Sequence, residues 1–255
     1  MISVRISTEE PPLKRAALAV VSVLALTSAL TACSGGEDTP SGGRVTTTPK
    51  AKQITPEQRL AKAIVTKDDL PGYNVDELDA EYAFATSSDQ VTVDKPGCAP
   101  LALAMNQLPL GEPQADLTRS AGAGYGKEST YITLASYEPA AEGRSLLAGL
   151  AKAVSECGGG FTAKAGKNST VYDSVTAEKG TAPGAVAFRA TTPFRGITHT
   201  VRTQVVRHGE VLAVYFSVNG FAFADSRRPS DAKIPAEVVK AQNSELARDS
   251  ESPER

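Results

Sequence analysis

The chain has 255 residues, of which 41% are hydrophobic, so it is long and apolar enough to form one or two domains with a sizeable core. Its 27 basic and 29 acidic residues leave a formal charge of -2. No strong positive field results, and we expect no nucleic-acid partner.

The N-terminus has the pattern of an export signal. Lys14 and Arg15 precede a weakly polar and apolar run over residues 16–30, and small residues follow. The run is shorter than the roughly 20 residues that cross a bilayer comfortably. We therefore expect a cleaved signal, with an uncleaved signal anchor as the alternative, and place everything after Cys33 outside the membrane.

The stretch Leu30-Thr31-Ala32-Cys33 resembles the lipobox of bacterial lipoproteins. The resemblance implies that residues 1–32 are a signal peptide and that the Cys33 thiol carries diacylglycerol. Two acyl chains anchor a protein stably where one chain is marginal. The expected partner is thus the membrane, bound through Cys33 at the outer face of the bacterial cytoplasmic membrane. An ordinary buried or free thiol is the alternative.

Lipidation of Cys33 would leave two cysteines, Cys98 and Cys157, in an oxidising compartment. An even pair in that setting favours a structural disulfide. A metal site or redox pair is the alternative, but neither a C-x-x-C spacing nor a histidine accompanies the two cysteines.

Residues 33–53 are rich in Ser, Thr, Gly and Pro, which predicts a lipidated cysteine followed by a disordered tether. A helix is then expected, with Thr55 as N-cap, Pro56 at the first position and Gln58 completing a capping box. This helix opens a domain predicted over residues 54–247.

Apolar residues recur at helical spacing over residues 98–108 and 140–157, and a closing helix is predicted over 235–247. Cys98 begins the first of these helices and Cys157 ends the second. Both lie on the apolar stripes, as a disulfide between neighbouring helices requires. The polar residues 248–255 are predicted to be a disordered tail.

Strand patterns occupy six segments, namely 116–125, 129–137, 169–178, 184–192, 198–207 and 210–218. Their alternation predicts an α+β fold in which helices pack on one face of an antiparallel sheet.

A two-residue turn at His208-Gly209 would join the last two strands. In that register Val205 lies opposite Leu212, and Arg202 lies opposite Tyr215.

The same alternation places tyrosines, arginines and a glutamine on a sheet face without helices. The candidate ligand-binding residues are Tyr131, Tyr137, Arg189, Arg202, Gln204 and Tyr215. Such side chains favour recognition of anionic or sugar-like groups. The alternative is a solvated face with an Arg202–Tyr215 cross-strand pair.

Motifs for catalysis are incomplete. Ser120–Lys127 suggests a phosphate loop but lacks the Walker spacing, and Glu128 stands where Ser or Thr is needed. Ser230–Lys233 matches S-x-x-K without its companion motifs. Two histidines, His199 and His208, leave few nucleophile–base arrangements. We therefore predict no catalytic residues and a non-enzymatic protein.

Acidic residues gather at Asp76, Glu77, Asp79 and Glu81. They lack the glycine turn and the ligand spacing of an EF-hand loop, so a solvated strand or loop is favoured over a calcium site. We expect neither a metal nor a cofactor.

Three stretches together, Asp68–Val75, Gly97–Ala102 and Tyr131–Cys157, resemble an actinobacterial extracellular sensor-type domain. Such domains occur as free lipoproteins and as the outer portion of PknH-type serine/threonine kinases. The resemblance implies an α+β sandwich with a ligand-binding cleft. Because this sequence has no kinase domain, no transmembrane helix and no second cysteine pair, it does not carry over signalling across the membrane.

The predicted function is therefore a lipid-anchored extracytoplasmic protein that binds an unknown ligand or envelope component. The alternative is an envelope scaffold or interaction protein without a small-molecule site.

Overall fold

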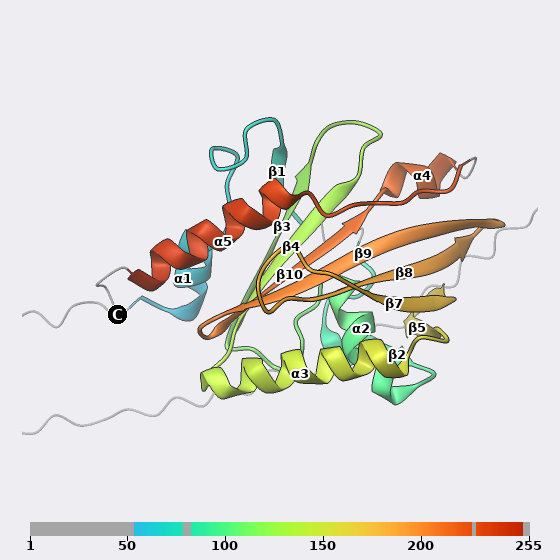
Figure 1. Cartoon of the computed structure of the whole chain (residues 1–255), viewed down its shortest axis with the longest axis horizontal. Helices are drawn as coiled ribbons and strands as arrows, with labels where there is room; N and C mark the ends of the chain where they lie inside the picture. Colours follow the sequence, from blue (N-terminus) through green and yellow to red (C-terminus); the bar gives the residue numbers. More distant parts are fainter. Residues whose placement is uncertain (1–53, 79–82, 226–227, 252–255) are drawn as a thin grey trace, which may run out of the picture. The chain divides into compact units, whose positions relative to one another are not determined.

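The computed structural model describes residues 54–78, 83–225 and 228–251 (Figure 1). The predicted signal peptide, the lipidated Cys33 and the tether lie outside the described residues, as do Asp79 and Glu81. Within the described ranges, no helix combines the length and the apolar character needed to cross a membrane.

Helices and strands are interspersed up to α3, after which six strands follow one another before the last two helices. In order they are α1 (Pro56–Ala63), β1 (Asn74–Glu77), η2 (Ser88–Gln90), β2 (Val91–Val93), η3 (Pro96–Cys98), α2 (Ala99–Ala104), β3 (Ala115–Gly122), β4 (Ser129–Ser136), α3 (Ala140–Glu156), β5 (Phe161–Ala165), β6 (Asn168–Tyr172), β7 (Ser174–Glu178), β8 (Val186–Phe194), β9 (Ile197–His208), β10 (Val211–Val218), α4 (Gly220–Asp225) and α5 (Ala236–Glu251).

The strands form a seven-stranded sheet in the order β1-β3-β4-β10-β9-β8-β7 and a three-stranded sheet in the order β2-β5-β6. All pairings between these strands are antiparallel, so the predicted α+β class with an antiparallel sheet is confirmed. The segment 169–178, expected as one strand, divides between the two sheets at Asp173.

Helices cover both faces of the large sheet, which corrects the expectation of helices on one face only. Figure 1 shows α1 and α5 together on one side of the sheet and α3 on the other. Two separate core clusters match these two sides. The reason is that β4 and β10 are apolar on both sides: residues 212–217 are buried without interruption. A strand buried on both faces needs a packing layer on each.

A buried glutamine joins the two helices of one layer, α1 and α5. Gln242 of α5 accepts a hydrogen bond from the Val65 backbone N–H at 3.0 Å and donates one to the Ala63 carbonyl at 2.7 Å. Both groups belong to the C-terminal end of α1, where backbone polar groups lack helical partners. At the other end of α1, the predicted capping box of Thr55 and Gln58 is confirmed.

The opposite layer contains the disulfide between Cys98 and Cys157, which confirms the predicted pair. Cys98 precedes α2 and Cys157 follows α3, with their Cα atoms 6.0 Å apart. Both cysteines are buried in the core cluster of this face. The bridge therefore fixes the end of α3 against the start of α2.

The β9–β10 register differs from the predicted one by two residues. Val205 lies opposite Val214, and Gln204 rather than Arg202 lies opposite Tyr215. His208, predicted to lie in the turn, instead pairs with Val211, so the turn consists of Gly209 and Glu210, with Gly209 supplying a φ of +56°. Because a shift of two residues preserves the side-chain alternation, the predicted faces of β9 and β10 are correct.

The C-terminal helix also extends further than predicted. α5 continues to Glu251, past the boundary expected at residue 247. The first part of the predicted disordered tail is therefore helical, and residues 252–255 lie outside the described ranges.

Replacing both bridging cysteines by alanine should lower the free energy of unfolding by about 4 kcal/mol, because the bridge joins residues 59 apart in sequence. Urea denaturation of the unit Lys50–Arg255 measures the difference. An unchanged denaturation midpoint would contradict a stabilising bridge.

Candidate functional site

The six candidate binding residues do not form one surface. Arg189 pairs with Arg202 and Gln204 with Tyr215 across neighbouring strands, so these four side chains share the face of α1 and α5. Tyr131 pairs with Phe216 and lies on the opposite face, which also contains Tyr137. The expected single face of tyrosines and arginines is therefore wrong.

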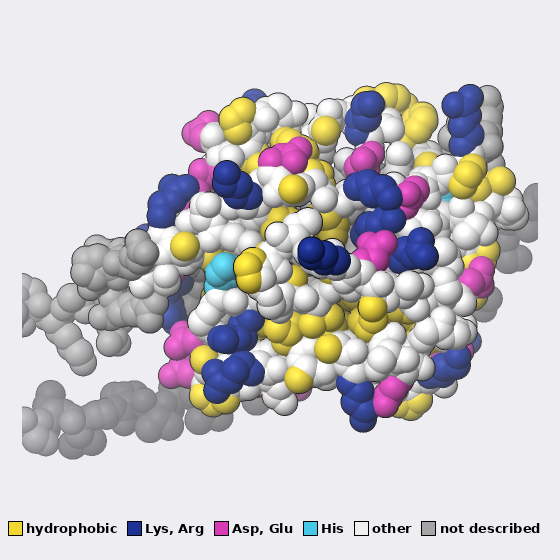
Figure 2. Space-filling view, viewed as in Figure 1, with side chains coloured by type: hydrophobic (Ala, Val, Ile, Leu, Met, Phe, Trp, Pro, Cys, Tyr) yellow, Lys and Arg dark blue, Asp and Glu magenta, His cyan; other side chains and the backbone are white. Residues whose placement is uncertain are grey.

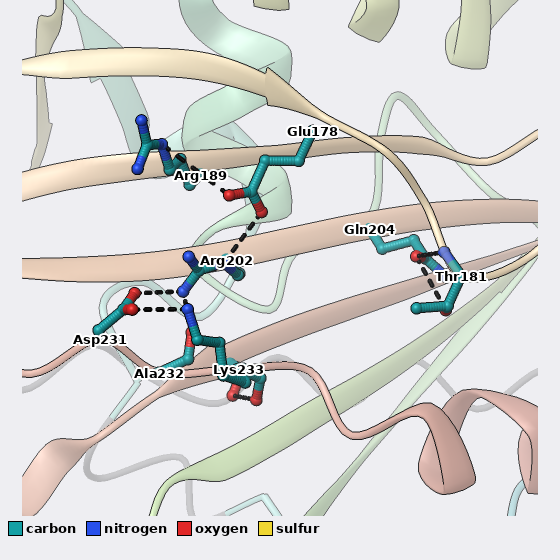
Figure 3. Close-up of polar contacts among 9 residues, drawn as sticks. Glu178, Thr181, Arg189, Arg202, Gln204, Asp231, Ala232 and Lys233 are labelled. Carbon is teal, nitrogen blue, oxygen red and sulfur yellow. Dashed lines mark hydrogen bonds and ion pairs between the residues drawn. The ribbon is translucent and has the colours of Figure 1, made fainter.

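Arg202 is held by groups of the same chain (Figure 3). Its Nε donates to Glu178 Oε2 at 2.9 Å, and its Nη1 donates to the Ala232 carbonyl at 2.7 Å and to Asp231. Only 13% of the side chain is exposed. Burial acts against the charged form, but the hydrogen bonds that the guanidinium donates to Asp231 and Glu178 outweigh it and raise the pKa of Arg202. The guanidinium thus joins β7 and β9 to the segment before α5.

Three other candidates also have internal partners. Gln204 Oε1 accepts hydrogen bonds from the backbone N–H and hydroxyl of Thr181. The Tyr215 hydroxyl donates to Asn243 Oδ1 at 2.8 Å, and the Tyr137 hydroxyl donates to a backbone carbonyl. All three side chains are buried, so they stabilise the fold and present no open binding group.

Arg189 is the exposed member of the set, with 48% of its side chain accessible and its Nε 3.9 Å from Glu178 Oε1. Its neighbourhood contains charges of both signs. Figure 2 shows several Lys and Arg side chains right of the middle of this view, with Asp and Glu side chains beside them. Both candidate arginines of this face are therefore paired with carboxylates of the same chain.

Tyr131 lines a cleft on the face of α2 and α3. Its ring stacks on Phe216, with centroids 6.2 Å apart and an interplanar angle of 24°. The cleft has a volume of about 440 Å³. We name it the Tyr131 cleft; it is lined by Ala83, Phe84, Met105, Asn106, Gln107, Tyr131, Asn168, Ser169, Thr170, Tyr172, Thr192, Val201, Phe216, Val218 and Phe223.

The walls of the Tyr131 cleft come from both sheets. β4, β9 and β10 supply the apolar floor, while β6 and the residues after α2 supply amides and hydroxyls. None of the described residues that line it carries a formal charge. Burial raises the pKa of Tyr172 to about 12, so its hydroxyl is protonated at neutral pH. The cleft therefore combines aromatic surface with neutral hydrogen-bonding groups.

Sequence reasoning missed most of this cleft. Asn106, Gln107, Asn168 and Thr192 were not predicted as binding residues, and Ser169 and Thr170 were predicted only as part of the strand over residues 169–178. These residues are far apart along the chain and meet only because β6 belongs to the second sheet. Gln107 has a φ of 56°, which is unusual for a residue other than glycine. This backbone conformation is visible only in the structure, so it could not mark the residue in the sequence.

One histidine and one serine are in contact outside this cleft. His199 Nδ1 lies 3.0 Å from Ser230 Oγ, and the imidazole stacks on Phe223 with ring centroids 4.1 Å apart. His199 is fully buried, and its Nε2 has no partner among the described residues. No third group orients the imidazole, so this pair lacks the arrangement of a nucleophile and its base.

One of the two acidic residues of β1 has a partner within the chain. Glu77 Oε1 lies 3.0 Å from Arg119 Nη2 in a surface ion pair. Within the described ranges, no group of three or more His, Cys, Asp or Glu side chains is placed to hold a metal ion.

Comparison with known proteins gives a likeness in fold. No family model and no curated protein matches the sequence. Among solved structures, the chain is similar to the extracellular domain of PknH from Mycobacterium tuberculosis, with a TM-score of 0.51 and 10% identity. The match covers 79% of this chain and 99% of that one. The fold is therefore similar to that of this extracellular domain.

Replacing Arg202 by alanine should lower the free energy of unfolding by about 1–3 kcal/mol, because it removes the buried hydrogen bonds to Glu178 and Ala232. Arg189→Ala is the matched control on the same face and should change stability by less than about 0.5 kcal/mol. Urea denaturation measures both variants. Equal losses would contradict the assignment of Arg202 as the residue that joins these segments.

Acidification should destabilise the protein partly through His199. Burial lowers the pKa of this imidazole in the folded state, so its contribution to stability is present above the unfolded pKa of about 6.5. That contribution is lost as the pH falls toward the lowered pKa. The unfolding free energy measured between pH 7.5 and 5 should therefore fall less in His199→Asn than in the wild type. Parallel curves would show that the buried imidazole has no such role.

Proposed function

We propose that the chain is a lipid-anchored extracytoplasmic protein, non-enzymatic, that binds an uncharged and partly apolar ligand in the Tyr131 cleft. The likeness in fold to an extracellular domain supports the location. The lipobox-like stretch ending at Cys33 supports the anchor.

The assignment of an uncharged ligand rests on the neutral lining of the cleft, whose volume is about 440 Å³. This volume falls in the range of small-molecule sites. A charged ligand would lose water there without gaining an opposite charge, which is unfavourable. The lining thus selects against the anionic ligands that the arginines first suggested.

The cleft offers different contacts at its floor and its rim. Tyr131 and Phe216 present stacked rings that can bury an apolar group. At the rim, Asn168 Nδ2 already donates to the Phe84 carbonyl at 3.0 Å, which fixes the amide and leaves its oxygen to accept from a ligand. Such fixed polar groups would orient the ligand.

The described residues that line this cleft include no histidine, carboxylate or lysine that could act as a general acid or base. Neither His199 nor Ser230, the pair in hydrogen-bond contact, belongs to its lining. Binding without reaction is therefore the activity we assign.

The neutral dye N-phenyl-1-naphthylamine tests the cleft through its fluorescence on binding. Thr170→Arg, which puts a charge into the cleft, should weaken dye binding at least 10-fold in the unit Lys50–Arg255. Val171→Arg is the matched control, because the next residue of β6 is 45% exposed and does not line the cleft. Equal affinities in the two variants would place the dye elsewhere, and absence of dye binding to the wild type would favour a scaffold role.

The anchor is tested by Cys33→Ser in the full chain expressed in a bacterial host. The variant should move from the membrane fraction to the soluble fraction, because the thiol that receives diacylglycerol is gone. Mass spectrometry of the wild type should show an acylated N-terminal cysteine. Membrane association that survives the substitution would indicate an uncleaved anchor instead.

A further inference from the structure

Exposed aromatic side chains gather at one end of the large sheet. Among the described residues, the large exposed hydrophobic side chains are Tyr125 (90% exposed), Val171 (45%), Phe221 (43%) and Phe194 (38%). The three aromatic ones come from the β3–β4 loop, α4 and the end of β8. Solvent-exposed rings held by an ordered framework are typical of binding surfaces.

Tyr125 and Phe221 form a pair on this end. Their ring centroids are 5.0 Å apart with an interplanar angle of 62°. Asn219 connects the two segments that bear them: its Nδ2 lies 3.5 Å from the Gly126 carbonyl, and its Oδ1 accepts from the Ala222 backbone N–H at 3.0 Å. The pair is thus positioned although its members lie far apart in sequence.

A polar hollow adjoins the ring pair. Its volume is about 520 Å³, and Phe221 forms part of its wall. The polar residues that line it are Glu128, Asn219, Arg228, Ser230 and Asp231. Asp231 is tied to Arg202 and Lys233 by ion pairs and still has 56% of its side chain exposed. The hollow therefore offers positioned carboxylate, amide and hydroxyl groups beside an aromatic surface.

We infer that Tyr125, Phe221 and this hollow form a binding site for a neutral saccharide. A sugar ring has C–H groups that pack on an aromatic face and hydroxyls that both donate and accept hydrogen bonds. Carboxylates and an amide accept from those hydroxyls, and Arg228 donates to them.

The charges of the hollow exclude two other ligand classes. Among the described residues, Glu128 and Arg228 carry opposite charges, and Asp231 belongs to a paired group in which two carboxylates, Glu178 and Asp231, meet Arg202 and Lys233. The described lining thus presents no net positive charge that would attract an anionic ligand. A nucleic acid would likewise need a basic groove for its phosphates. A neutral saccharide needs neither a net positive charge nor a basic groove.

This saccharide site is separate from the Tyr131 cleft. α4 lies between them, since Phe223 lines the cleft while Phe221 and Ala222 line the hollow. The inference therefore does not depend on a ligand in the cleft, and either site can fail its test alone.

The position of the saccharide site suits recognition of a glycan outside the membrane. Val218 at the end of β10 pairs with Ser129 at this end of the sheet. The opposite end carries the β9–β10 turn, where Glu210 lies 3.6 Å from Arg59 of α1. A chain held through residues that precede α1 would thus be held at the end remote from the site.

The test uses the full chain in a non-glycosidic detergent and an array of neutral and anionic oligosaccharides. At least one neutral oligosaccharide should bind, and Tyr125→Ala and Phe221→Ala should each weaken it at least 10-fold. Both rings are exposed, so their removal leaves the core intact. Phe194→Ala is the matched aromatic control at the same end and should change affinity less than twofold, because Phe194 does not line the hollow.

Three results would overturn the inference. They are failure of the wild type to bind any neutral oligosaccharide, unchanged affinity in Tyr125→Ala, and a preference for anionic oligosaccharides.

Discussion

The burial of β4 and β10 on both faces is the constraint on which the rest of the structure depends. Consecutive residues of these strands point to opposite sides, and from Leu212 to Ser217 every one of them is buried. Each face of the sheet therefore needs its own packing layer. α1 and α5 supply one, joined through Gln242, while α2 and α3 supply the other, joined through the disulfide.

These two packing layers also determine which polar side chains of the large sheet are open to a ligand. On the face of α1 and α5, the polar groups of β9 and β10 must find partners inside the protein, because burial of an unpaired polar group is costly. The Gln204 side-chain oxygen, the Tyr215 hydroxyl and the Arg202 guanidinium all do so, while Gln204 Nε2 has no partner among the described residues. On the other face, no residue of α3 lines the region around Tyr131, and the second sheet closes it only partly. Open space with neutral walls remains there.

Much of the fold could be predicted from local patterns, since helix caps, helical spacing and the cysteine pair depend on nearby residues. Thr55, Pro56 and Cys157 all lie where these patterns place them. The covered second face was not predicted, because Arg202 and Gln204 look like a solvent-facing row until their partners Glu178 and Thr181 are known. The cleft could not be predicted for a similar reason: its walls meet where β6 of the second sheet lies against β8 of the large sheet, a long-range contact that no single segment encodes.

We propose that the ligand site is the neutral Tyr131 cleft and not the face that bears Arg189 and Arg202. The most direct measurement compares two fluorescent dyes that share one skeleton, N-phenyl-1-naphthylamine and its sulfonated, anionic relative 8-anilinonaphthalene-1-sulfonate. We expect the neutral dye to bind at least 10-fold more tightly to the unit Lys50–Arg255, with NMR shift changes at Tyr131, Thr192 and Phe216. Tighter binding of the anionic dye, with shift changes at Arg189 and Arg202 instead, would contradict the account.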